Sequence, residues 1–267
     1  MELKLMQENK KSLFNENLLN NKVVLITGAG QGIGKGIARQ FLMVGANVIF
    51  IGRHIEKLEN TSEELCRELK IDKASRTCCI ETDVTDEIQI KEMICHLMNR
   101  FGRIDILCNN AGISREMPFI NMPIDTFDNI MTTNMRSVML VTKAVLPIMI
   151  KQNYGRIINI GSGAALRGLP GSAAYSASKG AVVTFTQSLG DEIRNIMKQR
   201  NIRINAICPG PVDTEMFQKS ERRQFILEAG GDVTTVDEMG YAAVYLASDL
   251  SGVMNSQVLT LRGFNRW

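Results

Sequence analysis

Short apolar runs alternate with longer amphipathic segments along most of the chain. The runs are rich in β-branched residues and cover residues 22–27, 47–51, 77–81, 104–108, 156–160, 203–208 and 257–261. Helical spacing of apolar positions between them predicts helices over about residues 33–44, 55–70, 86–100, 125–151, 173–198 and 236–248. Strands buried on both faces give continuous apolar runs, and parallel strands need helical crossovers. The pattern therefore predicts an α/β fold with a doubly wound, mostly parallel sheet in three layers.

The length of 267 residues fits one domain with a short extension. Residues 1–20 are rich in Asn and Lys and are expected to form a flexible arm, although Phe14, Leu18 and Leu19 could pack on the domain edge. Residues 21–267 contain no repeat and no low-complexity linker, and we expect them to form the single domain. The helix that starts near residue 173 is expected to extend through Arg200.

Composition and charge exclude several functional classes. The net charge is only +3, from 31 basic and 28 acidic side chains, and no cluster concentrates it, so we expect no nucleic-acid partner. No apolar run reaches 18 residues and no secretory leader is evident, so we expect no membrane span. The six cysteines contain no CxxC motif, and we interpret them as reduced thiols of a cytoplasmic protein. No grouping has metal-ligand spacing, so no metal site is predicted.

A glycine-rich loop separates the first predicted strand from the first helix. Its sequence from Thr27 to Gly36 is TGAGQGIGKG, which fits neither the P-loop nor G-x-G-x-x-G but does fit T-G-x-x-x-G-x-G. Glycines allow close backbone approach, and the helix N-terminus offers unpaired N–H groups to a pyrophosphate. We therefore expect a nucleotide in a Rossmann-type fold; a tight turn without a ligand is the alternative.

The second predicted strand leads into Gly52-Arg53, with no carboxylate before Glu56. At this distance from the glycine loop, an acidic residue binds the ribose hydroxyl of NAD, whereas an arginine suits the 2′-phosphate of NADP. The sequence thus favours NADP(H) over NAD(H). The alternative is that Arg53 is a solvated loop charge, and no basic residue occupies position 31 to reinforce it.

Tyr175 and Lys179 are four residues apart on one predicted helix, so both side chains project from one face. A lysine beside a phenol favours the phenolate and makes the hydroxyl more useful as an acid or base at neutral pH. Ser162 follows the strand at residues 156–160, at the edge of the sheet where ligands bind. A serine-hydrolase elbow is excluded, because Ile160 stands where G-x-S-x-G needs a glycine.

Together these motifs resemble the short-chain dehydrogenase/reductase family, in its compact single-domain type, over about residues 20–261. The resemblance rests on the glycine loop, the Asn-Asn-Ala-Gly segment at 109–112, Asn134, Ser162 thirteen residues before Tyr175, Lys179, and Pro209-Gly210. It implies that residues 21–267 form an NAD(P)-binding catalytic domain. Asn109 and Asn110 remain open to a purely structural interpretation as turn residues.

The resemblance also implies a role for each member of a catalytic set. Tyr175 is expected to be the general acid/base, and Lys179 to bind the nicotinamide ribose and lower the pKa of Tyr175. Ser162 is expected to hydrogen-bond the substrate oxygen. Asn134 is expected to hold a water molecule that links Lys179 to solvent.

The cofactor-binding residues implied by the resemblance follow the strand ends. Asp83 matches the adenine contact, Asn110 and Ala111 border the adenine ribose, and Thr214 matches the carboxamide contact. The full expected set is Gly28, Gln31, Gly32, Ile33, Gly34, Arg53, Asp83, Val84, Asn110, Ala111, Gly112, Tyr175, Lys179, Pro209, Gly210, Val212 and Thr214.

Two regions bear on substrate and assembly. A substrate lid is expected near residues 214–232, where Met216, Phe217 and Phe225 stand among charged residues, although an amphipathic surface helix explains the pattern equally. Arg115 and Arg167 follow strand ends and could meet an anionic substrate, or simply face solvent. The C-terminal tail departs from the family pattern at Arg262, so the homo-oligomer that the resemblance implies, a tetramer or dimer, is less secure.

The sequence therefore predicts an NADP(H)-dependent alcohol dehydrogenase or ketoreductase that transfers a hydride between nicotinamide and a small-molecule secondary alcohol or ketone. A 3-oxoacyl-thioester reductase is the alternative within the class. A non-catalytic NADP sensor is the alternative outside it.

Overall fold

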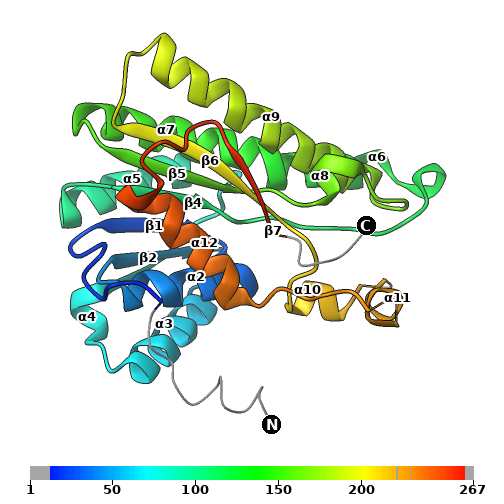
Figure 1. Ribbon diagram of the computed structural model, residues 1–267, viewed down its shortest axis with the longest axis horizontal. Coiled ribbons are helices and arrows are strands. Elements are labelled where there is room, and N and C mark those ends of the chain that lie inside the picture. The colour runs from blue at the N-terminus through cyan, green and yellow to red at the C-terminus, as the bar shows by residue number, and fades with distance from the viewer. Residues whose placement is uncertain (1–12, 221, 229, 262–267) are drawn as a thin grey trace.

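Seven parallel strands form one sheet in the order β3-β2-β1-β4-β5-β6-β7. The computed structural model describes residues 13–220, 222–228 and 230–261 (Figure 1). The strands are β1 Val23–Thr27, β2 Asn47–Gly52, β3 Thr77–Glu81, β4 Ile106–Asn109, β5 Gly155–Ile160, β6 Ile202–Pro209 and β7 Val258–Leu261. The predicted doubly wound α/β fold is confirmed.

Helices cover both faces of the sheet because alternate strand residues supply two separate apolar cores. In β1, Val24 and Ile26 join one core, while Val23 and Leu25 join the other. The first core is covered by α2 Gly32–Met43, α3 Ile55–Leu69 and α12 Val236–Ala247. The second is covered by α5 Glu87–Phe101, α7 Ser137–Lys151 and α9 Ala173–Asn195 (Figure 1).

Shorter helices lie in the connections: α4 Lys73–Arg76, α6 Ile124–Met131, α8 Ala164–Arg167, α10 Glu215–Gln218 and α11 Arg223–Glu228. The helix predicted over residues 125–151 contains a π turn, Thr132–Arg136, between α6 and α7. The prediction that α9 extends through Arg200 is wrong. The chain leaves the helix after Asn195, since Lys198 is left-handed (φ 58°) and the Gln199 N–H closes on the Ile193 carbonyl at 3.0 Å.

Part of the predicted N-terminal arm packs against the domain. Leu19 is buried, and its N–H donates to the Val44 carbonyl at 2.9 Å. Phe14 and Leu18 pack against the same core. Residues 1–12 and the tail at 262–267, which includes Arg262, lie outside the described residues.

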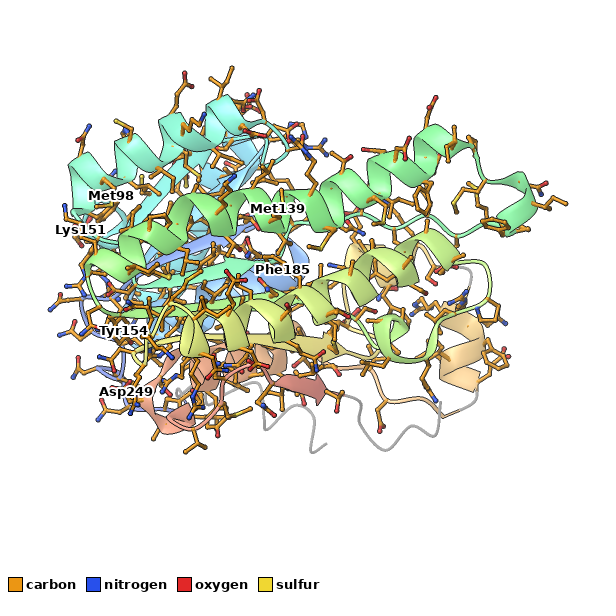
Figure 2. All side chains as sticks on the ribbon, turned by 90° about the horizontal axis from the view of Figure 1, so that it is seen from above. Met98, Met139, Lys151, Tyr154, Phe185 and Asp249 are labelled. Atoms are coloured by element: carbon orange, nitrogen blue, oxygen red, sulfur yellow. The ribbon has the colours of Figure 1, made fainter. Side chains whose placement is uncertain are left out.

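The side chains at the two ends of the strands differ in chemistry. At the amino-terminal end, the ring of Tyr154 lies close to two cations: the Lys22 ammonium is 3.9 Å from its centroid and the Arg156 guanidinium 4.3 Å. Figure 2 shows Tyr154 and Asp249 at this end, opposite α10 and α11. The carboxyl ends of the strands lie at the opposite end. There β1 pairs with β2 on one side and with β4 on the other, and the chain returns across the sheet from β3 to β4. This is the switch point at which ligands bind in such sheets.

Candidate active site

The glycine loop turns sharply between β1 and α2. Gly28 and Gly32 have positive φ values of 66° and 51°, which side chains rarely adopt. A Cβ on Gly34 would lie 2.3 Å from the Gly28 carbonyl oxygen, so this glycine is required for packing of the turn itself. Gln31 precedes α2 without capping it through its side chain. The first N–H groups of α2 are therefore available to an anion.

Asparagines after β4 bind this loop to the rest of the switch point. The Asn110 side chain donates to the carbonyls of Thr27 at 2.9 Å and Gly28 at 3.1 Å. The Thr27 hydroxyl accepts the N–H groups of Asn110 and Ala111, both at 3.0 Å. Asn109 is buried and donates to Asn159 Oδ1 at 2.8 Å. These bonds support the structural interpretation of both asparagines, and Asn110 still faces the cavity.

Two basic residues stand at the end of β2. Arg53 is exposed and lines the cavity, as the sequence predicts. Lys57, in the first turn of α3, lines the same cavity and donates to Gln31 Oε1. Lys57 was missed from the sequence, because only the packing of α3 beside the glycine loop brings it to position 31.

Asp83 and Val84 form the next part of the cavity wall, after β3. One carboxylate oxygen of Asp83 accepts the Thr85 N–H at 2.9 Å and its hydroxyl at 2.7 Å. This turn fixes the direction of the Asp83 carboxylate.

Tyr175 and Ser162 both line the cavity, and Ser162 lies close enough to the Tyr175 phenol to influence its pKa. Ser162 lies in the turn after β5, and its hydroxyl also accepts the Ala164 N–H at 3.1 Å. Burial raises the pKa of Tyr175, and the Ser162 side chain partly opposes that rise.

Lys179 lies one helical turn after Tyr175 and is only 4% exposed. Its ammonium donates to the Ile160 carbonyl at 2.8 Å, and burial lowers its pKa to about 8. The expected lowering of the Tyr175 pKa by Lys179 stays a prediction. Burial is the main influence on the pKa of the Tyr175 phenol, and the Lys179 ammonium is bound to the backbone of β5.

Asn134 is fully buried in the π turn behind the cavity wall. Its carboxamide accepts the Ile113 N–H at 2.7 Å and donates to the Ile113 carbonyl and the Ser178 hydroxyl, both at 2.9 Å. A Cβ on Gly112 would lie 3.1 Å from Asn134 Oδ1 and 3.3 Å from Lys179 Nζ, so the two side chains border the same glycine. Both amide hydrogens bind protein acceptors, which gives Asn134 a positioning role; its water-holding role stays a prediction.

The buried ammonium makes stability depend on pH in a defined direction. Between pH 8 and 10.5 the unfolded chain holds a proton on Lys179 that the folded chain has lost, so folded stability rises with pH. We expect the free energy of unfolding of the wild type to gain about 2–3 kcal/mol over this range relative to Lys179→Met. Urea denaturation at pH 7.5, 8.5, 9.5 and 10.5 measures this. Lys151→Met, at an exposed site on α7, is the control, and parallel curves for wild type and Lys179→Met would contradict the prediction.

The cavity has a volume of about 630 Å³ and runs from Arg53 to the segment around α10. It collects nearly all the predicted site residues; Gly34 and Asn134 lie behind its wall rather than in it. Pro209, Gly210, Val212 and Thr214 line it after β6. Met216 and Phe217 of α10 also line it, whereas Phe225 of α11 is 63% exposed and lies outside the lining.

The structure changes the assignment of charged residues around the predicted lid. Arg115 and Arg167 are exposed and do not line the cavity, whereas Arg222 does. Glu116, which sequence reasoning did not single out, also lines it. Within residues 13–220, 222–228 and 230–261, no three His, Cys, Asp or Glu side chains gather as a metal site. No helix in that part of the chain is long and apolar enough to cross a membrane.

Comparison with known proteins agrees with this geometry. The family model described as short chain dehydrogenase matches residues 22–224. The chain belongs to the short-chain dehydrogenase/reductase family. It is 35% identical to a 3-oxoacyl-(acyl-carrier-protein) reductase of Thermotoga maritima, over 92% of this chain and 98% of the relative. It is 34% identical to a 2-(R)-hydroxypropyl-CoM dehydrogenase of Xanthobacter autotrophicus, over 91% and 98%.

The solved structures give the same result. A crystal structure of levodione reductase superimposes with a TM-score of 0.84 at 28% identity, covering 92% of this chain and 97% of that one. Family membership and these relatives make the chain an NAD(P)-dependent oxidoreductase of the alcohol dehydrogenase/ketoreductase type.

Proposed function

We propose that this short-chain dehydrogenase/reductase interconverts a secondary alcohol and a ketone with NADP(H), using Asn134, Ser162, Tyr175 and Lys179. The observation that carries the proposal is that the hydroxyl-bearing side chains of Tyr175 and Ser162 line the same cavity as the glycine loop. A hydroxyl pair of this kind can hold a carbonyl oxygen and deliver a proton to it.

The residues present fit a dinucleotide. Gly28 and Gly32 leave room for close backbone approach, and the uncapped start of α2 favours a pyrophosphate. Asp83 and Val84 would border the adenine, and Asn110, Ala111 and Gly112 the centre of the cofactor. Lys179, Pro209, Gly210, Val212 and Thr214 would border the nicotinamide end. When bound, the cofactor supplies or accepts the hydride.

The protein's own contribution is proton transfer and charge stabilisation. Tyr175 would donate its phenolic proton to the carbonyl oxygen during reduction, and Ser162 would hydrogen-bond that oxygen as charge develops on it. Lys179, whose pKa is lowered to about 8 by burial, lies one helical turn away and would favour the phenolate left behind. Asn134 holds the loop after β4 against α9 through its bonds to Ile113 and Ser178.

The proposal is tested by measuring NADPH oxidation, at 340 nm, against a panel of neutral aliphatic and cyclic ketones. Acetoacetyl thioesters in the same panel test the 3-oxoacyl-thioester alternative. Turnover of at least one ketone is expected, whereas cofactor binding without any turnover would favour the sensor alternative.

We expect Arg53 and Lys57 to set the preference for NADP(H). Arg53→Ala and Lys57→Ala should each weaken NADPH binding by roughly 10–100-fold, since a charge-assisted hydrogen bond to phosphate is lost. NADH binding should change much less. Fluorescence titration gives both dissociation constants, and Arg67→Ala, in the last turn of α3 and outside the cavity lining, is the control. Equal losses for NADPH and NADH would refute the assignment.

Assembly and location are also part of the proposal. Family membership supports a homo-oligomer, a tetramer or dimer. All six cysteines lie in the described part of the chain and none forms a disulfide, which supports a reducing, cytoplasmic compartment.

A further inference from the structure

The segment between α10 and α11 brings the charged side chain of Arg222 to the catalytic cavity. Ser220 donates its hydroxyl hydrogen to Glu116 Oε1 at 2.9 Å, and the same hydroxyl oxygen accepts the Arg222 N–H at 3.2 Å. One serine thus ties this segment to the loop after β4. Ser220, Glu116 and Arg222 all line the cavity.

The Arg222 guanidinium reaches over the loop that leads into α9. Its Nη2 atom lies 3.7 Å from the position that a Cβ on Gly171 would take. Gly171 is four residues before Tyr175, has a φ of 70°, and accepts the Met117 N–H at 2.8 Å through its carbonyl. The absent side chain at Gly171 leaves space beside the guanidinium.

The charge of Arg222 is not neutralised by the described protein. No carboxylate of residues 13–220, 222–228 or 230–261 forms an ion pair with it, whereas Arg39, Arg103, Arg136 and Arg156 each have at least one. Glu116 lines the same cavity, but its carboxylate accepts the hydrogen bond of the Ser220 hydroxyl. A half-buried guanidinium without a counter-ion favours an anionic ligand, which it can hold in a bidentate manner.

Apolar side chains and hydroxyl groups share the cavity lining with Arg222 and the catalytic pair. Leu169, Met216 and Phe217 line the cavity, and Ser114 and Ser172 add hydroxyl groups. This lining suits a substrate with a short carbon chain that carries a carbonyl group towards one end and a negative charge at the other.

We propose that Arg222 binds an anionic group of the substrate, so that this enzyme prefers keto acids, or ketones bearing phosphate, to neutral ketones. The inference rests on the proposed function and adds the substrate class to it. The anion sits against the guanidinium, the chain lies on Leu169 and Phe217, and the carbonyl oxygen meets Tyr175 and Ser162. Arg222 is therefore a specificity-determining residue.

Calorimetric titration in the presence of NADP⁺ tests this without turnover, because the oxidised cofactor cannot reduce a ketone. The ligands are acetoacetate, levulinate and 5-oxohexanoate, each paired with its methyl ester. We expect at least one acid to bind about tenfold or more tightly than its ester. Arg222→Leu should remove this preference and Arg222→Lys should retain part of it. Glu116→Gln, which keeps the partner of Ser220 but removes a negative charge, should strengthen acid binding.

Arg167→Leu, at an exposed site outside the cavity lining, is the matched control and should keep the preference. Acetoacetyl-phosphopantetheine and acetoacetyl-pantetheine distinguish a carrier phosphate from a free carboxylate as the source of the anion. The proposal is overturned if wild type binds no anion more tightly than its neutral partner, or if Arg222→Leu weakens both members of each pair equally. Reduction of neutral ketones is measured separately, so that failure of the proposed function is distinguishable.

Discussion

Replacing Tyr175 with Phe is expected to lower kcat for ketone reduction by about 10³-fold or more. A loss of this size is typical when a general acid is removed. The substitution removes the phenolic hydroxyl and keeps the aromatic ring that lines the cavity. Without the phenolic hydroxyl, the carbonyl oxygen of the substrate receives a hydrogen bond from Ser162 but no proton from the enzyme. Because the loss falls on the transition state, kcat and kcat/KM should fall together.

NADPH binding should be nearly unchanged in Tyr175→Phe, which separates loss of the proton donor from loss of the fold. Tyr154→Phe is the matched control. Tyr154 lies at the opposite edge of the sheet, where its ring, rather than its hydroxyl, contacts Lys22 and Arg156 (Figure 2). Residual activity above roughly a tenth of wild type in Tyr175→Phe would assign the proton to another group.

The pH dependence of reduction also bears on Tyr175. Burial raises the pKa of its phenol, so the proton to be donated is held throughout the neutral range. The buried Lys179, whose pKa is about 8, loses its charge above that pH and no longer favours the phenolate. The two groups lie one helical turn apart, and their titrations are expected to be coupled in kinetic profiles.

The fold was predictable from sequence because its determinants are local and repeated. Each strand is a short apolar run buried on both faces, and the crossover helices fix the parallel order. The carboxyl ends of such strands converge at one edge, so residues after β1, β4, β5 and β6 could be expected to share a cavity. Tyr175, Ser162 and the glycine loop do share it.

Other features depend on tertiary packing and left no local signal. Lys57 reaches Gln31 only because α3 packs beside the loop, 26 residues away in sequence. Arg222 faces the cavity through Ser220 and Glu116, while Arg115 and Arg167, which follow strand ends more directly, remain outside. The end of α9 at Asn195 was missed because Lys198 adopts a left-handed conformation. Lysine rarely adopts this conformation, so the residue type gave no sign of it.

The role of Gly36 also depends on tertiary packing and could not be read from the local sequence. In the sequence this glycine ends the glycine-rich run, after the last glycine of the T-G-x-x-x-G-x-G pattern. In the structure it lies in α2 against α12, and a Cβ there would be 2.3 Å from the Val236 carbonyl oxygen and 2.6 Å from its carbonyl carbon. Gly240 of α12 faces the same contact, where a Cβ would be 2.8 Å from the Gly36 carbonyl oxygen. The two glycines therefore let two helix backbones touch.

Gly36→Ala is consequently expected to destabilise the protein by about 3 kcal/mol, the upper end for overpacking, even though alanine favours helix by about 1 kcal/mol. The contact is with backbone, so relief requires α2 and α12 to separate and lose the packing of the first core. For a domain of this size the melting temperature should fall by roughly 6–12 °C. Gly180→Ala in α9 is the matched control, since its Cβ would meet nothing closer than the Ala165 carbonyl oxygen at 3.8 Å. That variant should be as stable as wild type or slightly more so, and equal melting temperatures for the two variants would show that the contact between α2 and α12 can relax.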